Sequence, residues 1–260
     1  MKRNIIIGIV VIVIVAAGVA LYATGKLTPK PEATTAENQR ITLSPSGSYV
    51  ENGPYYDIAT NSPTTTPLVA TAGAFADTAA RSVIYGFIRD AIIQFKTEGN
   101  FDKLTSDDIK AMGFDQGRKE KLQIVYMISS SPRTVSYIFT ITTDTLGAHP
   151  NMAFRTFTFD TKTGAQLTLS DMFTAGSNYL GTLSSISRAQ LPAVIGSDAA
   201  GSFITDGTTP DDANFSNFFI DNGIFAILFA PYQVAPYSAG PQTLRIPLSQ
   251  LSGILKADYR

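Results

Sequence analysis

The 260-residue sequence contains no cysteine, no tryptophan and a single histidine, His149. Without cysteine, the chain has no disulfide, no thiol nucleophile and no lipid-bearing cysteine of a bacterial lipoprotein. A zinc hydrolase needs several histidine, cysteine or carboxylate ligands around its metal. One histidine therefore argues against a zinc deacetylase or amidase site.

Carboxylates are also scarce. Only five glutamates are present, two of them before residue 48, whereas a glycosidase needs two carboxylates flanking a cleft. Asp206, Asp211, Asp212 and Asn214 could ligate calcium, but their spacing fits no known loop motif, which favours solvated loop residues. A Ser-His-Asp triad would need His149 as its base, and the sequence has no Gly-x-Ser-x-Gly elbow. We expect no catalytic residue, metal or cofactor, and we interpret His149 as a structural loop histidine whose ring bonds to the backbone.

Basic residues are missing from one long stretch. Residues 190–243 contain five aspartates and no lysine or arginine, although the formal net charge of the chain is only −1. Nothing in this balance indicates a nucleic-acid partner. The stretch includes a proline-framed loop, residues 230–240, whose tyrosines are candidate anchors for a partner. The predicted contact residues are Tyr232, Pro236, Tyr237 and Ser238, with Asp211 and Asp212 nearby; the alternative is that at least one tyrosine packs under a sheet edge.

A long apolar run is present at the N-terminus. Residues 5–22 carry no charge and are long enough to cross a bilayer as a helix. Lys2 and Arg3 precede them, which predicts a cytoplasmic N-terminus and export of the remainder. A cleaved signal peptide is the alternative, because residues 18–20 offer a small-x-small cleavage site. We expect a single-pass protein of the bacterial cytoplasmic membrane, with residues 1–23 as tip and anchor and residues 24–48 as a disordered stalk.

The rest of the sequence predicts an α+β fold of mostly antiparallel sheets with about three packed helices. Helices are expected at residues 74–97, at 105–112 with Thr105 and Asp108 as a capping box, and from a Ser177 cap to Pro192. One edge strand is expected at residues 49–60, and residues 196–214 read as a polar loop. Further strands are expected at residues 122–129, 134–142, 152–159, 218–220, 224–229 and 242–247, with a closing helical turn at 248–251.

Residues 147–173 join a loop to a strand, a turn, a short second strand and a helical turn. Asp160 and Gly164 are suited to the turn, and Ser170 or Asp171 could cap the helical turn that follows. The segments GAHPN and FRTFTFDTKTGAQLTLSDMF, together with FAPYQVAPYSAG at residues 229–240, resemble the RsiV/PdaC-type extracytoplasmic domain pair. That pair forms the sensor half of lysozyme-responsive anti-sigma factors and the accessory region of some peptidoglycan deacetylases. Leu146 stands where this family often has a glycine, which predicts a less flexible loop.

The resemblance implies a motif loop at Gly147, His149, Pro150 and Asn151, and two halves, residues 49–146 (PdaC-type) and 147–260 (RsiV-like). It also implies lysozyme or a peptidoglycan fragment as the ligand. The sequence shows no sigma-binding segment before the anchor and no deacetylase domain after Arg260, so we expect the shared module alone. We expect a non-catalytic binding or sensing domain; the alternatives are a glycan hydrolase that uses carboxylates and a structural envelope protein without a ligand.

Overall fold

The computed structural model describes residues 41, 48–61, 74–199 and 201–260, without the side chains of residues 74–79. The predicted anchor and, apart from two residues, the predicted stalk lie outside this part. Within the described residues, no helix combines the length and the apolar character needed to cross a membrane. The fold is α+β with two mostly antiparallel sheets, as the sequence predicts.

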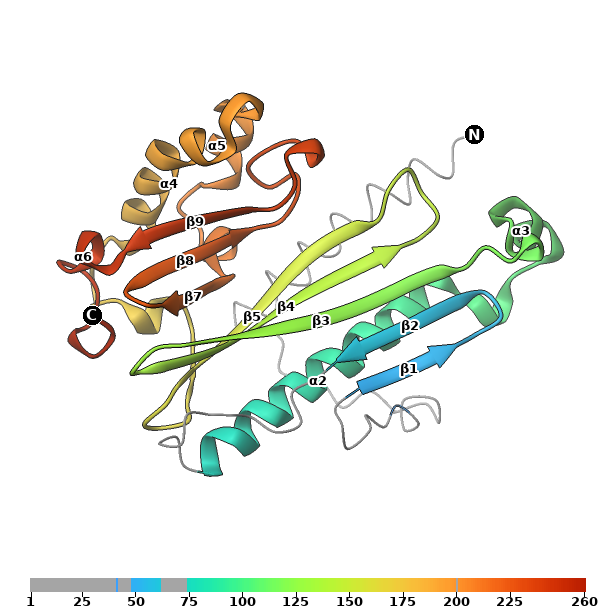
Figure 1. The fold of residues 1–260 in the computed structure, drawn as a ribbon, viewed down its shortest axis with the longest axis horizontal. Helices are drawn as coiled ribbons and strands as arrows, with labels where there is room; N and C mark the ends of the chain where they lie inside the picture. The colour runs from blue at the N-terminus through green and yellow to red at the C-terminus, as the bar shows by residue number, and fades with distance from the viewer. Residues whose placement is uncertain (1–40, 42–47, 62–73, 200) are drawn as a thin grey trace.

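The larger sheet has six strands in the order β1-β2-β3-β4-β5-β6 (Figure 1). Their bounds are β1 (Ser48–Asn52), β2 (Tyr56–Asn61), β3 (Glu120–Ser130), β4 (Thr134–Asp144), β5 (Asn151–Asp160) and β6 (Gln166–Leu167). Neighbouring strands are antiparallel except β2 and β3, which are parallel. This exception follows from the chain path: the long helix α2 (Ala74–Gly99) lies between these strands in the sequence, and a parallel pair needs such a crossover.

Helix α2 covers one face of the larger sheet. Its apolar side chains Ile84, Ile88 and Ile92 are fully buried or nearly so. They pack with alternating residues of the central strands, such as Leu122 of β3 and Phe139 of β4. The predicted helical and alternating patterns therefore describe this core correctly.

The smaller sheet consists of β7 (Phe218–Asp221), β8 (Ile224–Phe229) and β9 (Gln242–Pro247), all antiparallel. Helix α4 (Tyr179–Ile195) packs on it and shares a second core with it, which includes Leu183, Leu191 and Phe225. Figure 1 shows α2 and the smaller sheet on opposite faces of the larger sheet, with α4 and α5 (Gly201–Gly207) beyond the smaller sheet. The remaining helices are α3 (Ser106–Met112) and α6 (Leu248–Leu251).

The two sheets meet where β7 lies against β3, β4 and β5. Ile138 of β4 packs there with Phe219 and Ala226. Hydroxyl groups of the larger sheet bond the backbone of the smaller one: Thr156 Oγ1 accepts from the Phe218 N–H at 3.1 Å, and Ser129 Oγ donates to the Ile220 carbonyl at 3.1 Å. Threonine and serine side chains thus bond the backbone groups of β7 that no neighbouring strand pairs. Unpaired groups at a sheet edge need such protection.

Several local predictions need correction. Residues 49–60 form two strands instead of one, because the chain reverses around Gly53. Helix α4 is capped by Asn178, whose side chain accepts from the Gly181 N–H, and it continues past Pro192 to Ile195. The polar segment 196–214 contains α5 and two short 3-10 helices. The described residues contain five α-helices: the three expected helices, the expected closing turn at Leu248–Leu251, and the unpredicted α5.

The turn after β5 forms as predicted, but the next cap does not. Asp160 Oδ1 accepts from the backbone of Lys162 and Thr163, and Gly164 adopts φ 72°. Ser170 and Asp171 do not cap the next helical turn, because both lie inside it, in a 3-10 helix at Ser170–Met172. The Asp171 side chain instead accepts from the Thr168 N–H. The larger sheet continues through β5 and β6, beyond the predicted division near residue 146, and the two-half organisation stays a prediction.

Candidate functional site: an aromatic cluster between two loops

The first loop of the candidate site joins β4 to β5. The side chain of Asp144 accepts from the Leu146 N–H at 2.9 Å, and Leu146 adopts φ 60°, a conformation that glycine adopts at lower cost. This turn sets the path of the residues that follow. His149 and Pro150 lie just before the first residue of β5, so the sheet fixes their position on one side.

The second loop, residues 230–240, joins β8 to β9. Val234 and Ala235 are buried in the core of the smaller sheet. Gln233 donates to the carbonyls of Gly207 and Asn214, at 3.3 and 3.0 Å. A side chain at Gly207 would clash, because a Cβ there would lie 1.8 Å from the Gln233 carbonyl oxygen. The loop is therefore anchored on its inner side.

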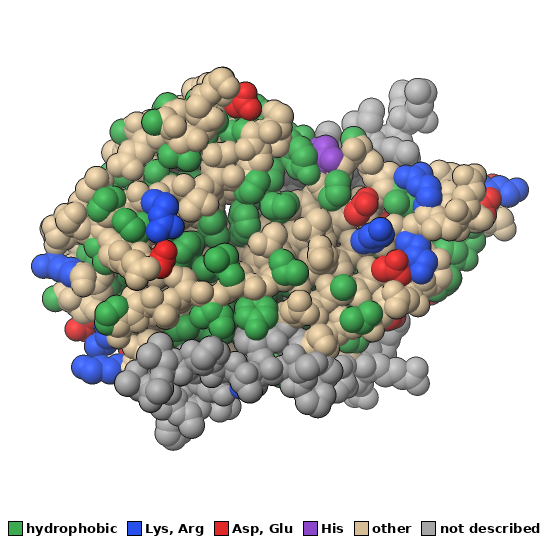
Figure 2. Space-filling model, viewed as in Figure 1, with side chains coloured by type: hydrophobic (Ala, Val, Ile, Leu, Met, Phe, Trp, Pro, Cys, Tyr) green, Lys and Arg blue, Asp and Glu red, His purple; other side chains and the backbone are tan. Residues whose placement is uncertain are grey.

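Tyr232 and Tyr237 of this loop meet His149. The imidazole is stacked on the Tyr237 ring, with centroids 3.7 Å apart and planes inclined by 19°. Tyr237 Oη donates to the Pro150 carbonyl at 2.8 Å, and Tyr232 Oη lies 3.2 Å from His149 Nε2. Figure 2 shows the histidine, in purple, beside hydrophobic side chains on this face. We call His149, Tyr232 and Tyr237 the aromatic cluster.

Both ring nitrogens of His149 lie within hydrogen-bond distance of a partner. His149 Nδ1 lies 3.0 Å from the Pro150 carbonyl, which can only accept, so Nδ1 is placed to donate to it. Nε2 is then free to accept from the Tyr232 hydroxyl. Among the described residues, neither a serine nor a carboxylate bonds this ring. The ring bonds to the backbone, as expected for a structural loop histidine.

Tyr232 is held in an unfavourable conformation. Its φ is 69°, in the left-handed region that bulky residues rarely adopt, and 49% of its surface is exposed. Strain of this kind persists only where the surrounding structure imposes it, and it is concentrated at functional positions. The exposed ring does not pack under a sheet edge, whereas Tyr237 is half-buried against His149.

The other predicted site residues have separate surroundings. Pro236 precedes the 3-10 helix that contains Tyr237 and the exposed Ser238; Gly147 and Asn151 are exposed beside His149. Asp211 caps a 3-10 helix through the Ala213 N–H, and Asp212 accepts from Tyr179 at 2.9 Å. Within the described residues, no hydrogen bond or ion pair joins either aspartate to the aromatic cluster. These residues also contain no group of three histidine or acidic side chains that could hold a metal ion.

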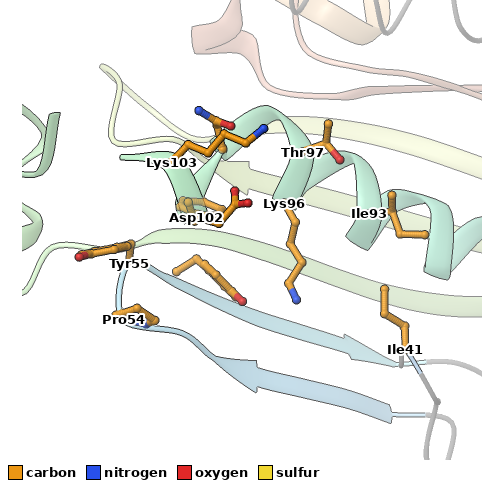
Figure 3. Close-up of a pocket in the computed structure, with 11 residues that line it drawn as sticks. Ile41, Pro54, Tyr55, Ile93, Lys96, Thr97, Asp102 and Lys103 are labelled. Carbon is orange, nitrogen blue, oxygen red and sulfur yellow. The ribbon is translucent and has the colours of Figure 1, made fainter. Parts of the chain in front are cut away.

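A concavity that the sequence does not predict lies beside the β1–β2 edge of the larger sheet. Its volume is about 410 Å³, and it opens between the β1–β2 hairpin and the C-terminal turns of α2. Figure 3 shows Lys96 reaching from α2 toward the hairpin, with Tyr55 and Pro54 at one end and Ile41 at the other.

Lys96 belongs to a hydrogen-bonded network whose polar side chains bond one another. Its Nζ lies 2.7 Å from Glu51 Oε1, which also accepts from Tyr56, while Tyr49 donates to the other oxygen. Burial raises the pKa of Glu51, but these donors outweigh it and lower the pKa overall. Burial likewise lowers the pKa of Lys96, and its bonds to Glu51 and Tyr56 raise it overall. Both groups therefore keep their charges at neutral pH, which is unsuited to proton transfer.

Comparisons with known proteins agree with this fold. Residues 170–249 match the family described as "Protein of unknown function (DUF3298)". Over 143 residues the chain is 31% identical to the peptidoglycan-N-acetylmuramic acid deacetylase PdaC of Bacillus subtilis strain 168; the match covers 55% of this chain and 31% of that protein. The chain thus spans about a third of its curated relative.

Two solved structures of DUF3298 family proteins are similar to this chain. A DUF3298 family member from Bacteroides fragilis NCTC 9343 matches with a TM-score of 0.51 and 15% identity, covering 81% of this chain and 93% of the other. A DUF3298 protein from Pseudomonas aeruginosa PAO1 has a TM-score of 0.42 and 16% identity, covering 60% and 71%. The match of residues 170–249 to the DUF3298 family model and the identity to PdaC confirm the resemblance to PdaC-type proteins that the motifs indicate.

Proposed function

We propose that this chain is a non-catalytic binding domain of the bacterial cell envelope, and that the aromatic cluster contacts peptidoglycan. The observation that carries the proposal is the convergence of two loops, far apart in the sequence, on one set of fixed rings. His149 and Tyr237 are held by a stack and by two hydrogen bonds to the Pro150 carbonyl. Rings fixed before binding lose little conformational entropy when a ligand arrives.

The chemistry of the cluster suits a sugar chain. Tyrosine and histidine offer an apolar face and a polar tip, and a sugar ring has C–H groups on its faces and hydroxyls at its rim. The half-exposed ring of Tyr232 presents such a surface. The name of the Bacillus subtilis relative supports peptidoglycan as the polymer. The charge-free run at residues 5–22 favours a membrane anchor that would hold the domain beside the wall.

Binding to purified peptidoglycan sacculi tests the proposal. The 260-residue chain in detergent should sediment with sacculi, and Tyr237→Ala should weaken this binding about thirtyfold if Tyr237 is a buried anchor in the complex. Val194→Ala is the matched control, because Val194 is an exposed apolar residue on α4. Equal binding by the wild type and by both Tyr237→Ala and Tyr232→Ala, all folded, would show that the cluster is not the contact surface.

A cationic protein such as lysozyme is a second candidate ligand. The base-free, acidic stretch at residues 190–243 favours it, since opposite charge accelerates association. Asp206 and Asp211 are exposed there. Asp206→Asn with Asp211→Asn should slow association with lysozyme at low salt and leave dissociation nearly unchanged. The absence of lysozyme binding at low salt would eliminate this candidate.

A further inference from the structure

Strand β5 borders the larger sheet for most of its length. Strand β6 pairs with it only at Thr158 and Phe159, near the C-terminal end of β5. The direction of each backbone group follows from the register. The Thr161 N–H bonds Arg133 on the β4 side, whereas the Asp160 N–H bonds Ala165 on the outer side. Because strand backbones alternate, the even-numbered residues of β5 direct their N–H and C=O groups outward.

One outward backbone group has a side-chain partner at each end of this border. At the N-terminal end, the Pro150 carbonyl accepts from Tyr237 Oη at 2.8 Å. At the other end, the Thr156 N–H donates to Asn217 Oδ1 at 3.2 Å. Between them, the outward N–H and C=O groups of Met152 and Phe154 have no hydrogen-bond partner among the described residues. Unpaired edge groups of this kind are a template for another strand.

The surroundings of this border restrict what can pair with it. Met152 and Phe154 are half-buried and lie on the same sheet face as Thr156, the face that carries the smaller sheet. Tyr237 and Asn217 both belong to the part of the chain that forms the smaller sheet, so a folded second copy approaching the edge would meet these segments at both ends. A single extended backbone needs only the space between them.

We infer that the edge of β5 between Pro150 and Thr156 binds an extended peptide segment of a partner protein by strand addition. The peptide lies antiparallel to β5, and Met152 and Phe154 each exchange two backbone hydrogen bonds with the residue opposite. Apolar side chains on these opposite residues face Met152 and Phe154. This inference depends on the backbone of β5 and does not require that the aromatic cluster bind peptidoglycan.

Hydrogen exchange of single amides, followed by NMR on the 260-residue chain in micelles, tests whether the edge is free. Without ligand, the Met152 and Phe154 amides should exchange much faster than those of Ala153 and Arg155, which face β4. Slow exchange at Met152 and Phe154 would mean that another segment or a second copy already covers the edge, and would overturn the inference.

Binding is tested with a seven-residue peptide whose two ends are capped. Its sequence is Lys-Thr-Val-Thr-Val-Thr-Glu. The expected result is slower exchange at Met152 and Phe154 when the peptide is added. Valines opposite Met152 and Phe154 direct their own amides toward β5. N-methylation of both valines should therefore weaken binding by about tenfold or more, whereas N-methylation of the threonines, whose amides face away, should not.

The same peptides separate this inference from the proposed function. If Tyr237→Ala loses sacculus binding but still binds the peptide, the aromatic cluster contacts sacculi and the β5 edge binds the peptide independently of it. Equal weakening by both N-methylated peptides, or no protection of Met152 and Phe154 at saturating peptide, would overturn strand addition whatever the result with sacculi.

Discussion

The imidazole of His149 is stacked on the phenol ring of Tyr237 at 3.7 Å, and both side chains bond the same carbonyl oxygen, that of Pro150. This contact joins the end of one sheet to the loop of the other. The motif loop around His149 and the proline-framed loop at residues 230–240 are far apart in the sequence. In the fold they therefore form one site.

Removing the imidazole should loosen this junction. We expect His149→Ala to lower the free energy of unfolding by about 1 kcal/mol, from the lost stack and hydrogen bonds. His149→Phe restores a ring without the nitrogens and should recover part of the loss. Urea denaturation of the three proteins measures this. A hydrolytic activity that disappears in His149→Ala at unchanged stability would contradict the structural role.

The strain at Tyr232 predicts that two variants without the ring differ in stability but are both impaired in binding. Both Tyr232→Gly and Tyr232→Ala remove the ring, but only glycine accepts φ 69° without cost. Tyr232→Gly should therefore be more stable than Tyr232→Ala by about 1 kcal/mol, while both bind sacculi more weakly than the wild type. Thermal unfolding and sacculus sedimentation measure the two properties. If the glycine and alanine variants are equally stable, the backbone is not strained in solution.

Asp160 should make stability depend on acid pH. Burial alone would raise its pKa, but bonds from Arg133 and from the backbone of Thr163 and Lys162 outweigh it and lower the pKa to about 2, from an ordinary value of 3.8. A lowered pKa stabilises the folded state above pH 4, and this contribution disappears as the pH falls toward 2. It amounts to roughly 2 kcal/mol.

The test compares the wild type with Asp160→Asn in urea at a series of pH values. Their difference in unfolding free energy should be largest at neutral pH and should shrink below pH 4. Asp160 also accepts a hydrogen bond from the Tyr259 hydroxyl at 3.2 Å, and asparagine keeps a side-chain oxygen that can accept it. A difference independent of pH would show that the carboxylate charge contributes nothing.

Glu120 should act in the opposite direction. Burial, with a smaller effect from the nearby negative charges of Asp144 and Glu98, raises its pKa to about 7, from an ordinary value of 4.5. The folded state resists ionisation of this carboxyl, so stability falls as the pH rises from 4.5 to 7 and stays low above that. Glu120→Gln should match the wild type near pH 4 and exceed it by roughly 3 kcal/mol at pH 8. Equal stability at pH 8 would contradict this assignment.

Local sequence patterns predict most of the elements. The apolar spacing at residues 74–97 corresponds to α2, and the alternation at residues 122–142 corresponds to β3 and β4. The capping box of Thr105 and Asp108 forms as predicted, and Gly113 ends that helix at φ 72°. These features depend on residues close together in the chain, which is why one sequence suffices to predict them.

Long-range relationships were not predictable in the same way. The parallel pairing of β2 with β3 depends on where α2 returns the chain, and the contact between His149 and Tyr237 depends on how two sheets stack. Threonines at positions 156 and 158 show β-propensity in the sequence, but their role in satisfying the edge of β7 exists only after the sheets meet. Sequence composition could indicate both loops of the site, and only the fold brings them together.

The single histidine allows a direct test of the aromatic cluster. Its imidazole proton resonances belong to one residue in the whole chain, so a titration of the 260-residue chain with soluble peptidoglycan fragments needs no assignment. The His149 resonances should show a saturable shift that is lost in Tyr232→Ala and retained in Val194→Ala. If calorimetry shows that the fragments bind while these resonances stay unmoved, the peptidoglycan site lies elsewhere and the aromatic cluster is not the contact surface.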